Sequence, residues 1–107
     1  MYAVIFEVEP KAGREKDYLE IAAALRSEVE KIDGFISIER FQSLAKPGKL
    51  VSISFWRDGD AVKRWREQSE HRQAQRQGRD SIFADYRISV AAVERQYGMF
   101  DRAGAPR

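Results

Sequence analysis

Residues 2–8 read YAVIFEV, a run of β-branched and aromatic residues that predicts a strand stopped by Pro10. Successive side chains of a strand point to opposite faces of its sheet. One face of this strand carries Tyr2, Val4, Phe6 and Val8, and the other carries Ala3 and Ile5. Both faces are therefore largely apolar, so a sheet built on this strand needs cover on both sides.

The rest of the chain predicts a helix, a hairpin, a second helix and a last strand. From Glu15 to the turn at Gly34, apolar residues recur at three- and four-residue steps, as on one stripe of a helix. FISIERFQSL (35–44) and LVSISFW (50–56) predict two strands joined by the turn AKPGK. Asp58 suits the N-cap of a second helix, which residues 66–79 either continue, with a break near Ser69, or follow as a separate turn. A closing strand is expected at about residues 86–97.

This order predicts an α+β fold, the ferredoxin-like βαββαβ arrangement with a four-stranded antiparallel sheet. We expect one domain over residues 1–97 and a C-terminal tail over 98–107. Two helices can cover only one face of such a sheet. An uncovered apolar face would expose several hundred Å², and sealing it is worth on the order of 10 kcal/mol before association costs. We therefore expect a homodimer in which sheet faces sheet.

The composition excludes several classes of function. Lys and Arg outnumber Asp and Glu by 19 to 17, and acidic residues interleave with the densest basic region, residues 57–79, so no nucleic-acid partner is expected. The chain has no cysteine, which excludes disulfides and thiolate metal sites and fits a cytoplasmic location. No metal site is expected, because one histidine would need several converging carboxylates. No apolar run suits a signal peptide or a membrane span.

The stretch WREQSEHRQ, residues 65–73, holds the only histidine and one of two tryptophans. His71 is the candidate general base, because an imidazole with a pKa near 6.5 can take a proton at neutral pH. It can also be a helix-end imidazole bonded to a carboxylate such as Glu67 or Glu70. Trp65 is either a core residue of its helix or a ring that stacks on a substrate. The two roles of Trp65 are compatible.

Three further residues are candidates for substrate binding. Phe6 is expected in the interior, where it can wall a ligand. Tyr86 and Arg87 are neighbours on the last strand, so their side chains leave opposite faces. Arg87 needs an anion, either a carboxylate such as Glu39 or a substrate oxygen. The polar stretch 73–79 is either an exposed helix end or a lid over the pocket.

GFISIERFQSL, PGKLVSISFW, AVKRWREQSEHRQAQRQGR and ADYRISVAAVERQYG, in this order and spacing, resemble the antibiotic biosynthesis monooxygenase family, from about residue 2 to Tyr97. The resemblance implies a dimeric α+β barrel and oxidation of a small aromatic or quinol-like molecule by O2, sometimes without any cofactor. It also implies an apolar pocket between the helices and the sheet. In such chemistry the substrate is the reductant, and the protein holds the ring, takes a proton and excludes water.

The resemblance leaves two alternatives. One is a dimer that binds a small ligand without catalysis. The other is haem binding or degradation, for which related proteins have an Asn on the first strand and a His ten residues after the helix tryptophan. Here those positions hold Phe6 and Gln75, so no cofactor is expected and haem is the weaker alternative.

Overall fold

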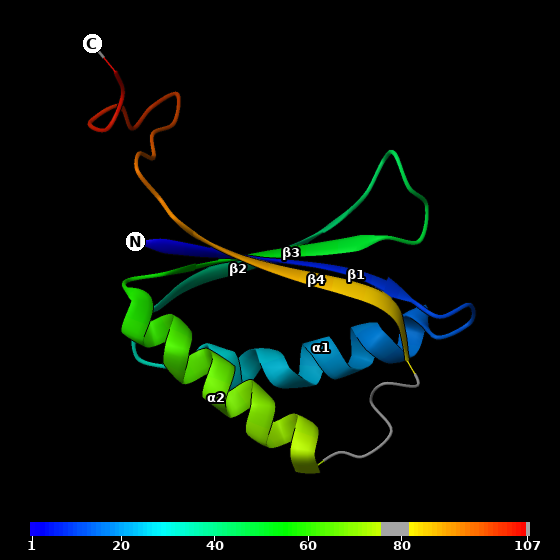
Figure 1. Ribbon diagram of the computed structural model, residues 1–107. Helices are drawn as coiled ribbons and strands as arrows, with labels where there is room; N and C mark the ends of the chain where they lie inside the picture. The colour runs from blue at the N-terminus through cyan, green and yellow to red at the C-terminus, as the bar shows by residue number, and fades with distance from the viewer. Residues whose placement is uncertain (76–81, 107) are drawn as a thin grey trace.

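The computed structural model describes residues 1–75 and 82–106, and it describes side chains up to residue 69 and from residue 82. Within these residues the strands are Tyr2–Pro10 (β1), Phe35–Gln42 (β2), Leu50–Trp56 (β3) and Phe83–Ala92 (β4), and the helices are Glu15–Val29 (α1) and Gly59–Gln75 (α2). The strands form one antiparallel sheet in the order β2-β3-β1-β4, and both helices lie on the same face of it (Figure 1). The ferredoxin-like βαββαβ prediction is confirmed.

The core lies between the helices and the central strands. Its two clusters of buried residues are Val4, Trp56, Ala61 and Val62, and Val8, Tyr18, Leu50 and Ile82. Val4 and Val8 come from β1, so the face of β1 that includes Phe6 is the helix side. Val4 packs against α2 and Val8 packs against α1. The middle of β1 therefore lies beneath the gap between the two clusters.

The opposite face of the sheet is also apolar at its centre. Pairing places Ile5 against Ile53 and Ala3 against Phe55 on this face. None of the described helices or strands covers it (Figure 1). Both faces of the sheet are therefore apolar, as the sequence of β1 predicts, and the two helices cover only one of them.

A network of charges closes one end of the fold. The Asp58 side chain accepts a hydrogen bond from the Ala61 N–H at 2.9 Å, which confirms the predicted N-cap of α2. Arg57 binds both carboxylate oxygens of Asp33, at 3.1 and 3.2 Å, and also contacts Asp58 at 3.1 Å. The turn after α1 is thus fixed to the start of α2.

Two predicted boundaries need correction. The last strand is Phe83–Ala92 rather than 86–97, because β4 pairs with β1 alone and that ladder ends with Tyr2 opposite Ala92. Residues 66–75 belong to one helix with residues 59–65, so a separate turn is wrong for them. Residues 76–79 of that prediction, and with them most of the suggested lid, lie outside the described residues. The chain beyond Ala92 extends away from the sheet (Figure 1).

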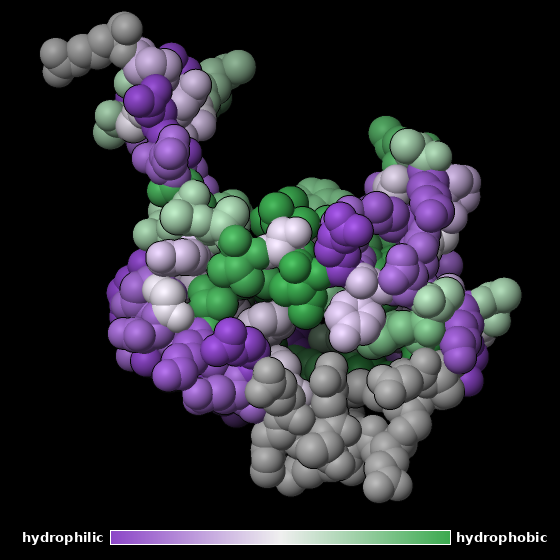
Figure 2. Space-filling model, in the orientation of Figure 1, coloured by the Kyte–Doolittle hydropathy of each residue, from purple (hydrophilic) through white to green (hydrophobic). Residues whose placement is uncertain are grey.

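The helix-side face of β4 is not fully covered. Tyr86, Ile88 and Val90 point to this side and are about half exposed. Figure 2 shows the hydrophobic residues that gather over this part of the molecule. No helix of the described residues is long and apolar enough to cross a membrane.

Candidate functional site

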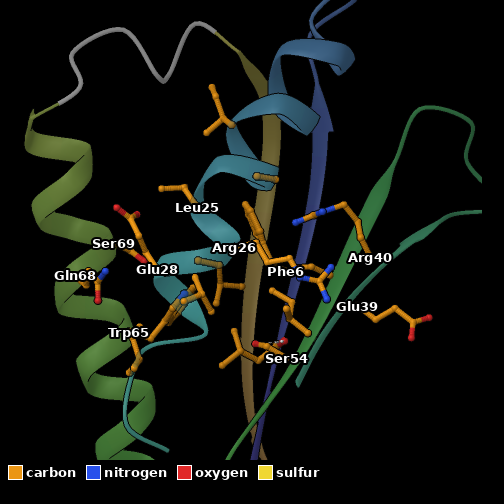
Figure 3. A pocket seen from close by; sticks show the side chains of 18 of the residues that line it. Phe6, Leu25, Arg26, Glu28, Glu39, Arg40, Ser54, Trp65, Gln68 and Ser69 are labelled. Carbon is orange, nitrogen blue, oxygen red and sulfur yellow. Dashed lines mark hydrogen bonds between the residues drawn. The ribbon is translucent and has the colours of Figure 1, made fainter. Parts of the chain in front are cut away.

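A pocket of about 540 Å³ lies between α1, α2 and the helix side of the sheet (Figure 3). Most of its lining is apolar: α1 contributes Ile21, Leu25 and Val29, and the sheet contributes Val4, Phe6 and Ile38. Such a size and lining suit a small organic ligand, whose orientation is set by a few polar groups.

Two serines on β3 open the floor of this pocket. The alternation of LVSISFW places Leu50, Ser52, Ser54 and Trp56 on the helix side. Small serine side chains leave space under the helices where larger residues would fill it. The Ser54 hydroxyl accepts a hydrogen bond from the Trp56 indole N–H at 2.8 Å, whereas the Ser52 hydroxyl has no such partner among the described residues.

Trp65 forms the wall on the α2 side. Its ring lies 6.3 Å from that of Trp56, which is fully buried. A second hollow of about 570 Å³ lies on the other side of α2, over β1 and β4, and is also lined by Phe6, Trp65 and Ser69. The structure thus brings the predicted residues Phe6 and Trp65 together, on the border between two apolar spaces.

Tyr86 borders only the second of these spaces. Its ring packs edge-on against Phe6, with centroids 5.9 Å apart, and tilts against Phe83 at 6.0 Å. Tyr86 is 54% exposed, so it contributes an outer rim rather than a closed wall.

The structure does not bring Arg87 into either space. Arg87 pairs across strands with Glu7, on the face away from the helices. The pKa of the Glu7 carboxyl lies below its usual value, because Lys49 donates a hydrogen bond to it and the positive charges of Lys49 and Arg87 lie nearby. The carboxylate facing Arg87 is therefore Glu7 and not Glu39, and the helix-side pocket has no contribution from Arg87.

His71 falls within α2, but its side chain lies outside the described residues. The same holds for Gln75, the position at which haem-degrading relatives have a histidine. Gln68 and Ser69, on the preceding turn of α2, line the pocket and are half-buried. They add amide and hydroxyl groups to its α2 wall.

Sequence reasoning missed Arg40. Its guanidinium lies 5.8 Å from the centre of the Tyr18 ring, and Arg40 lines the pocket from β2. The Nε atom is buried and has no hydrogen-bond partner among the described residues. The sequence does show that Arg40 and Ile38, two residues apart on one strand, share a face of the sheet. Which face this is depends on the register of β2.

Polar groups therefore gather at two places in an otherwise apolar pocket. The sheet side contributes Glu39, Arg40, Ser52 and Ser54. The two helices contribute Arg26, Glu28, Gln68 and Ser69 (Figure 3). No group of three or more potential metal ligands is found among the described residues.

The antibiotic biosynthesis monooxygenase model matches residues 1–77. A jasmonate monooxygenase from Pyricularia oryzae is 46% identical over 93 residues, which is 87% of this chain and 43% of that protein. The chain thus spans less than half the length of this fungal relative. An uncharacterized protein of Bacillus subtilis, YqjZ, is 33% identical over 89% of this chain and 81% of its own length.

Solved structures share the fold at lower identity. The cofactor-independent oxygenase SnoaB from Streptomyces nogalater has a TM-score of 0.71 and 15% identity, over 89% of this chain and 94% of that one. The heme-degrader MhuD from Mycobacterium tuberculosis, with two hemes bound, has a TM-score of 0.73 and 15% identity, over 92% of this chain and all of that one. By the match of its own sequence to the family model, the chain belongs to the antibiotic biosynthesis monooxygenase family.

Proposed function

We propose that this protein is a monooxygenase-type oxidoreductase that uses O2 to oxidise a small aromatic or quinol-like molecule. The observation that carries this proposal is the apolar pocket walled by Phe6 and Trp65, with a few polar groups at its edges. A lining of this kind suits a flat aromatic ring, and apolar side chains keep water from the reacting carbon. Family membership and the relative named jasmonate monooxygenase support oxidative chemistry on small molecules.

The reaction needs no electron donor other than the substrate. A base removes an acidic proton, and the resulting anion reduces O2. One oxygen atom then enters the substrate as a carbonyl in place of two hydrogens, and the other leaves as water. His71 is our candidate base: it follows Gln68, which lines the pocket, by three residues, or nearly one turn of α2.

Haem fits this chain less well. Haem iron is held by imidazole, thiolate, thioether or phenolate groups. Among the described lining residues, Tyr18 alone offers such a group, and its ring is packed beneath Arg40. Phe6 occupies the position of the asparagine expected in haem-degrading relatives. SnoaB, named as cofactor-independent, provides a precedent on this fold for oxidation without haem.

We further propose that the protein acts as a cytoplasmic homodimer. The uncovered sheet face around Ile5, Ile53 and Phe55 supports pairing with a second copy. The tail, which extends away from the sheet (Figure 1), adds exposed apolar side chains at Met99 and Phe100. The cysteine-free sequence supports the location.

The test is O2 uptake by the purified protein with a panel of hydroquinones, anthrone-like compounds and jasmonate. We expect uptake with at least one compound and a loss of about a hundredfold or more in a His71→Ala variant, the size typical of a general base. The rate of the wild type should rise with pH as the base loses its proton, and His71→Ala should lose this dependence.

The outcomes separate the alternatives. Equal rates in the wild type and His71→Ala would remove His71 as the base while leaving the oxygenase activity. Binding of the panel compounds without O2 uptake would favour a dimer that only binds ligands. A Soret band that appears on haem titration and disappears in His71→Ala would support the haem alternative.

A further inference from the structure

Arg40 is placed by the sheet to face the pocket. It pairs with Ser52 across the β2–β3 ladder, and Ser52 is on the helix side of β3. Figure 3 shows Arg40 reaching from β2 towards the middle of the pocket. Its guanidinium lies over the Tyr18 ring, whose negative face attracts a cation. The Tyr18 contact holds the charge beside the cavity rather than out in solvent.

The charge of Arg40 lacks an anionic partner within the described residues. Other arginines of the chain have one: Arg14 contacts Asp17, Arg26 contacts Glu30 and Arg57 contacts Asp33. Arg40 is only partly exposed, and its buried Nε has no hydrogen-bond partner in the described part of the chain. A half-buried cation without an anionic partner costs stability, so its presence on the wall of a pocket favours a bound anion there.

Ser52 supplies a second donor beside it. Directly opposed residues of an antiparallel pair have their Cβ atoms about 5 Å apart. The Ser52 hydroxyl is the cross-strand neighbour of Arg40 and has no hydrogen-bond partner among the described residues. A guanidinium and a hydroxyl from such neighbouring positions can together bind the two oxygens of one carboxylate.

Two acidic residues border the pocket, Glu28 and Glu39. Figure 3 shows the Glu39 carboxylate directed away from the pocket. Glu28 follows Tyr18 by ten residues on α1, which is about 15 Å along the helix axis. Figure 3 shows Glu28 and Arg40 on opposite sides of the pocket. Apolar residues such as Phe6, Leu25 and Ile38 line the space between them. An anion beside Arg40 is therefore little affected by Glu28.

We propose that Arg40 and Ser52 bind a carboxylate group of the ligand, and that the protein selects small apolar acids over their neutral analogues. This inference rests on the proposed function in taking the pocket as the substrate site. The carboxylate lies at the Tyr18 end, and the ring to be oxidised extends towards Trp65 and Gln68. Arg40 is then a specificity residue, remote from the reacting carbon.

Calorimetric titration with 1-naphthaleneacetate and its methyl ester tests the inference. The two probes differ in charge and share the same ring. We expect the wild type to bind the acid at least ten times more tightly than the ester, the size of one hydrogen bond to a charged group. Arg40→Met should remove this preference by weakening the acid and not the ester. Arg87→Met removes the same charge from the other face and should leave the preference intact.

Two further variants sharpen the result. Ser52→Ala should weaken the acid severalfold and spare the ester. Arg40→Met should melt at the same temperature as the wild type or higher, since it removes an unpaired buried donor. Equal affinity of the wild type for acid and ester, an equal loss of both in Arg40→Met, or a Tm several degrees lower would overturn the proposal. Calorimetry needs no turnover, so failure here is separate from failure of the O2 chemistry.

Discussion

The two tryptophans show how much the role of a residue depends on its neighbours. Trp56 is fully buried, and its indole N–H donates to Ser54 at 2.8 Å, so it is a core residue. Trp65 lies one layer further out and separates the two apolar spaces. Both are aromatic residues on amphipathic elements, and the sequence alone does not tell them apart. Their roles differ because Trp65 borders a pocket, whereas Trp56 does not.

At the residue scale, the contact of Arg57 with Asp33 predicts an acid-sensitive stability. The hydrogen bond and the positive charge of Arg57 lower the pKa of Asp33 from its ordinary value of 3.8. The pKa of Asp58 is lowered by hydrogen bonds from the Ala61 N–H and from Arg57. A lowered pKa in the folded state means that the stabilisation is present above pH 3.8. It is lost as the pH falls through that value towards the lower folded pKa.

Thermal denaturation of the wild type and Arg57→Met between pH 3 and 7 measures this effect. We expect the Tm difference between them to be largest at neutral pH and to shrink below about pH 4, where the Asp33 carboxyl of the unfolded chain takes up a proton. Arg95→Met, an exposed substitution outside the network, serves as the control for net charge. A difference that is constant over the whole range would show that the Asp33 carboxylate contributes nothing to stability.

At the element scale, one irregularity in β2 explains why Arg40 was missed. Simple alternation from Phe35 puts Ser37, Glu39 and Phe41 on the same face as Phe35, and Arg40 on the other. In the structure Phe35 pairs with Trp56 and Ser37 with Phe55, so the register shifts at Ile36. This bulge brings Arg40 to the helix side. A bulge leaves little signal in sequence, whereas the strands themselves follow from their β-branched and aromatic residues.

Gly34, in the turn between α1 and β2, lies where a larger side chain would not fit. Gly34 has φ of +94°, and a Cβ built on it would lie 2.5 Å from the Cβ of Ala61 in α2. An alanine here therefore meets both a strained backbone and a steric clash. Gly48 has φ of +86°, but a Cβ added there would have no neighbouring atom within 4 Å. The two glycines share a positive φ, and only at Gly34 would an added Cβ meet a neighbouring atom.

We expect Gly34→Ala to destabilise the protein more than Gly48→Ala does. The backbone strain costs each variant about 1–2 kcal/mol. The clash adds roughly another 1–3 kcal/mol to Gly34→Ala. Urea denaturation measures both free energies of unfolding. Ala61→Gly in the Gly34→Ala background should recover part of the loss by removing the clashing atom. Equal losses in the two single variants would mean that α2 moves aside freely.

At the scale of the whole molecule, the sequence predicts the architecture well and the site only in part. The element order and the apolar stripes predict the ferredoxin-like fold, because both helices bury their apolar stripes against the same sheet. The pocket follows from the same order, since β1 brings Phe6 between the helices. The sheet face on which Arg87 lies, and the position of Arg40 on the pocket wall, both depend on strand register. No local sequence pattern specifies this register. The end of β4 depends on where its partner β1 begins.

The uncovered face of the sheet gives the last prediction. Ile53 lies at the centre of this face, opposite Ile5, and is half-buried even in the single chain. If two copies pair through this face, Ile53→Lys places a charge in a dry interface, where it has no partner and loses its hydration. The variant should then be a monomer at micromolar concentration, while the wild type is a dimer. Sedimentation velocity distinguishes the two states directly.

Leu19→Lys provides the matched control. Leu19 is an exposed residue of α1, on the helix layer and away from the bare sheet face. The same charge there should leave the dimer intact, so a loss of dimer in both variants would point to general destabilisation. A monomeric wild type at micromolar concentration would contradict pairing through the sheet outright. The apolar residues around Ile53 would then need another cover, since exposed patches of this size are rare on soluble monomers.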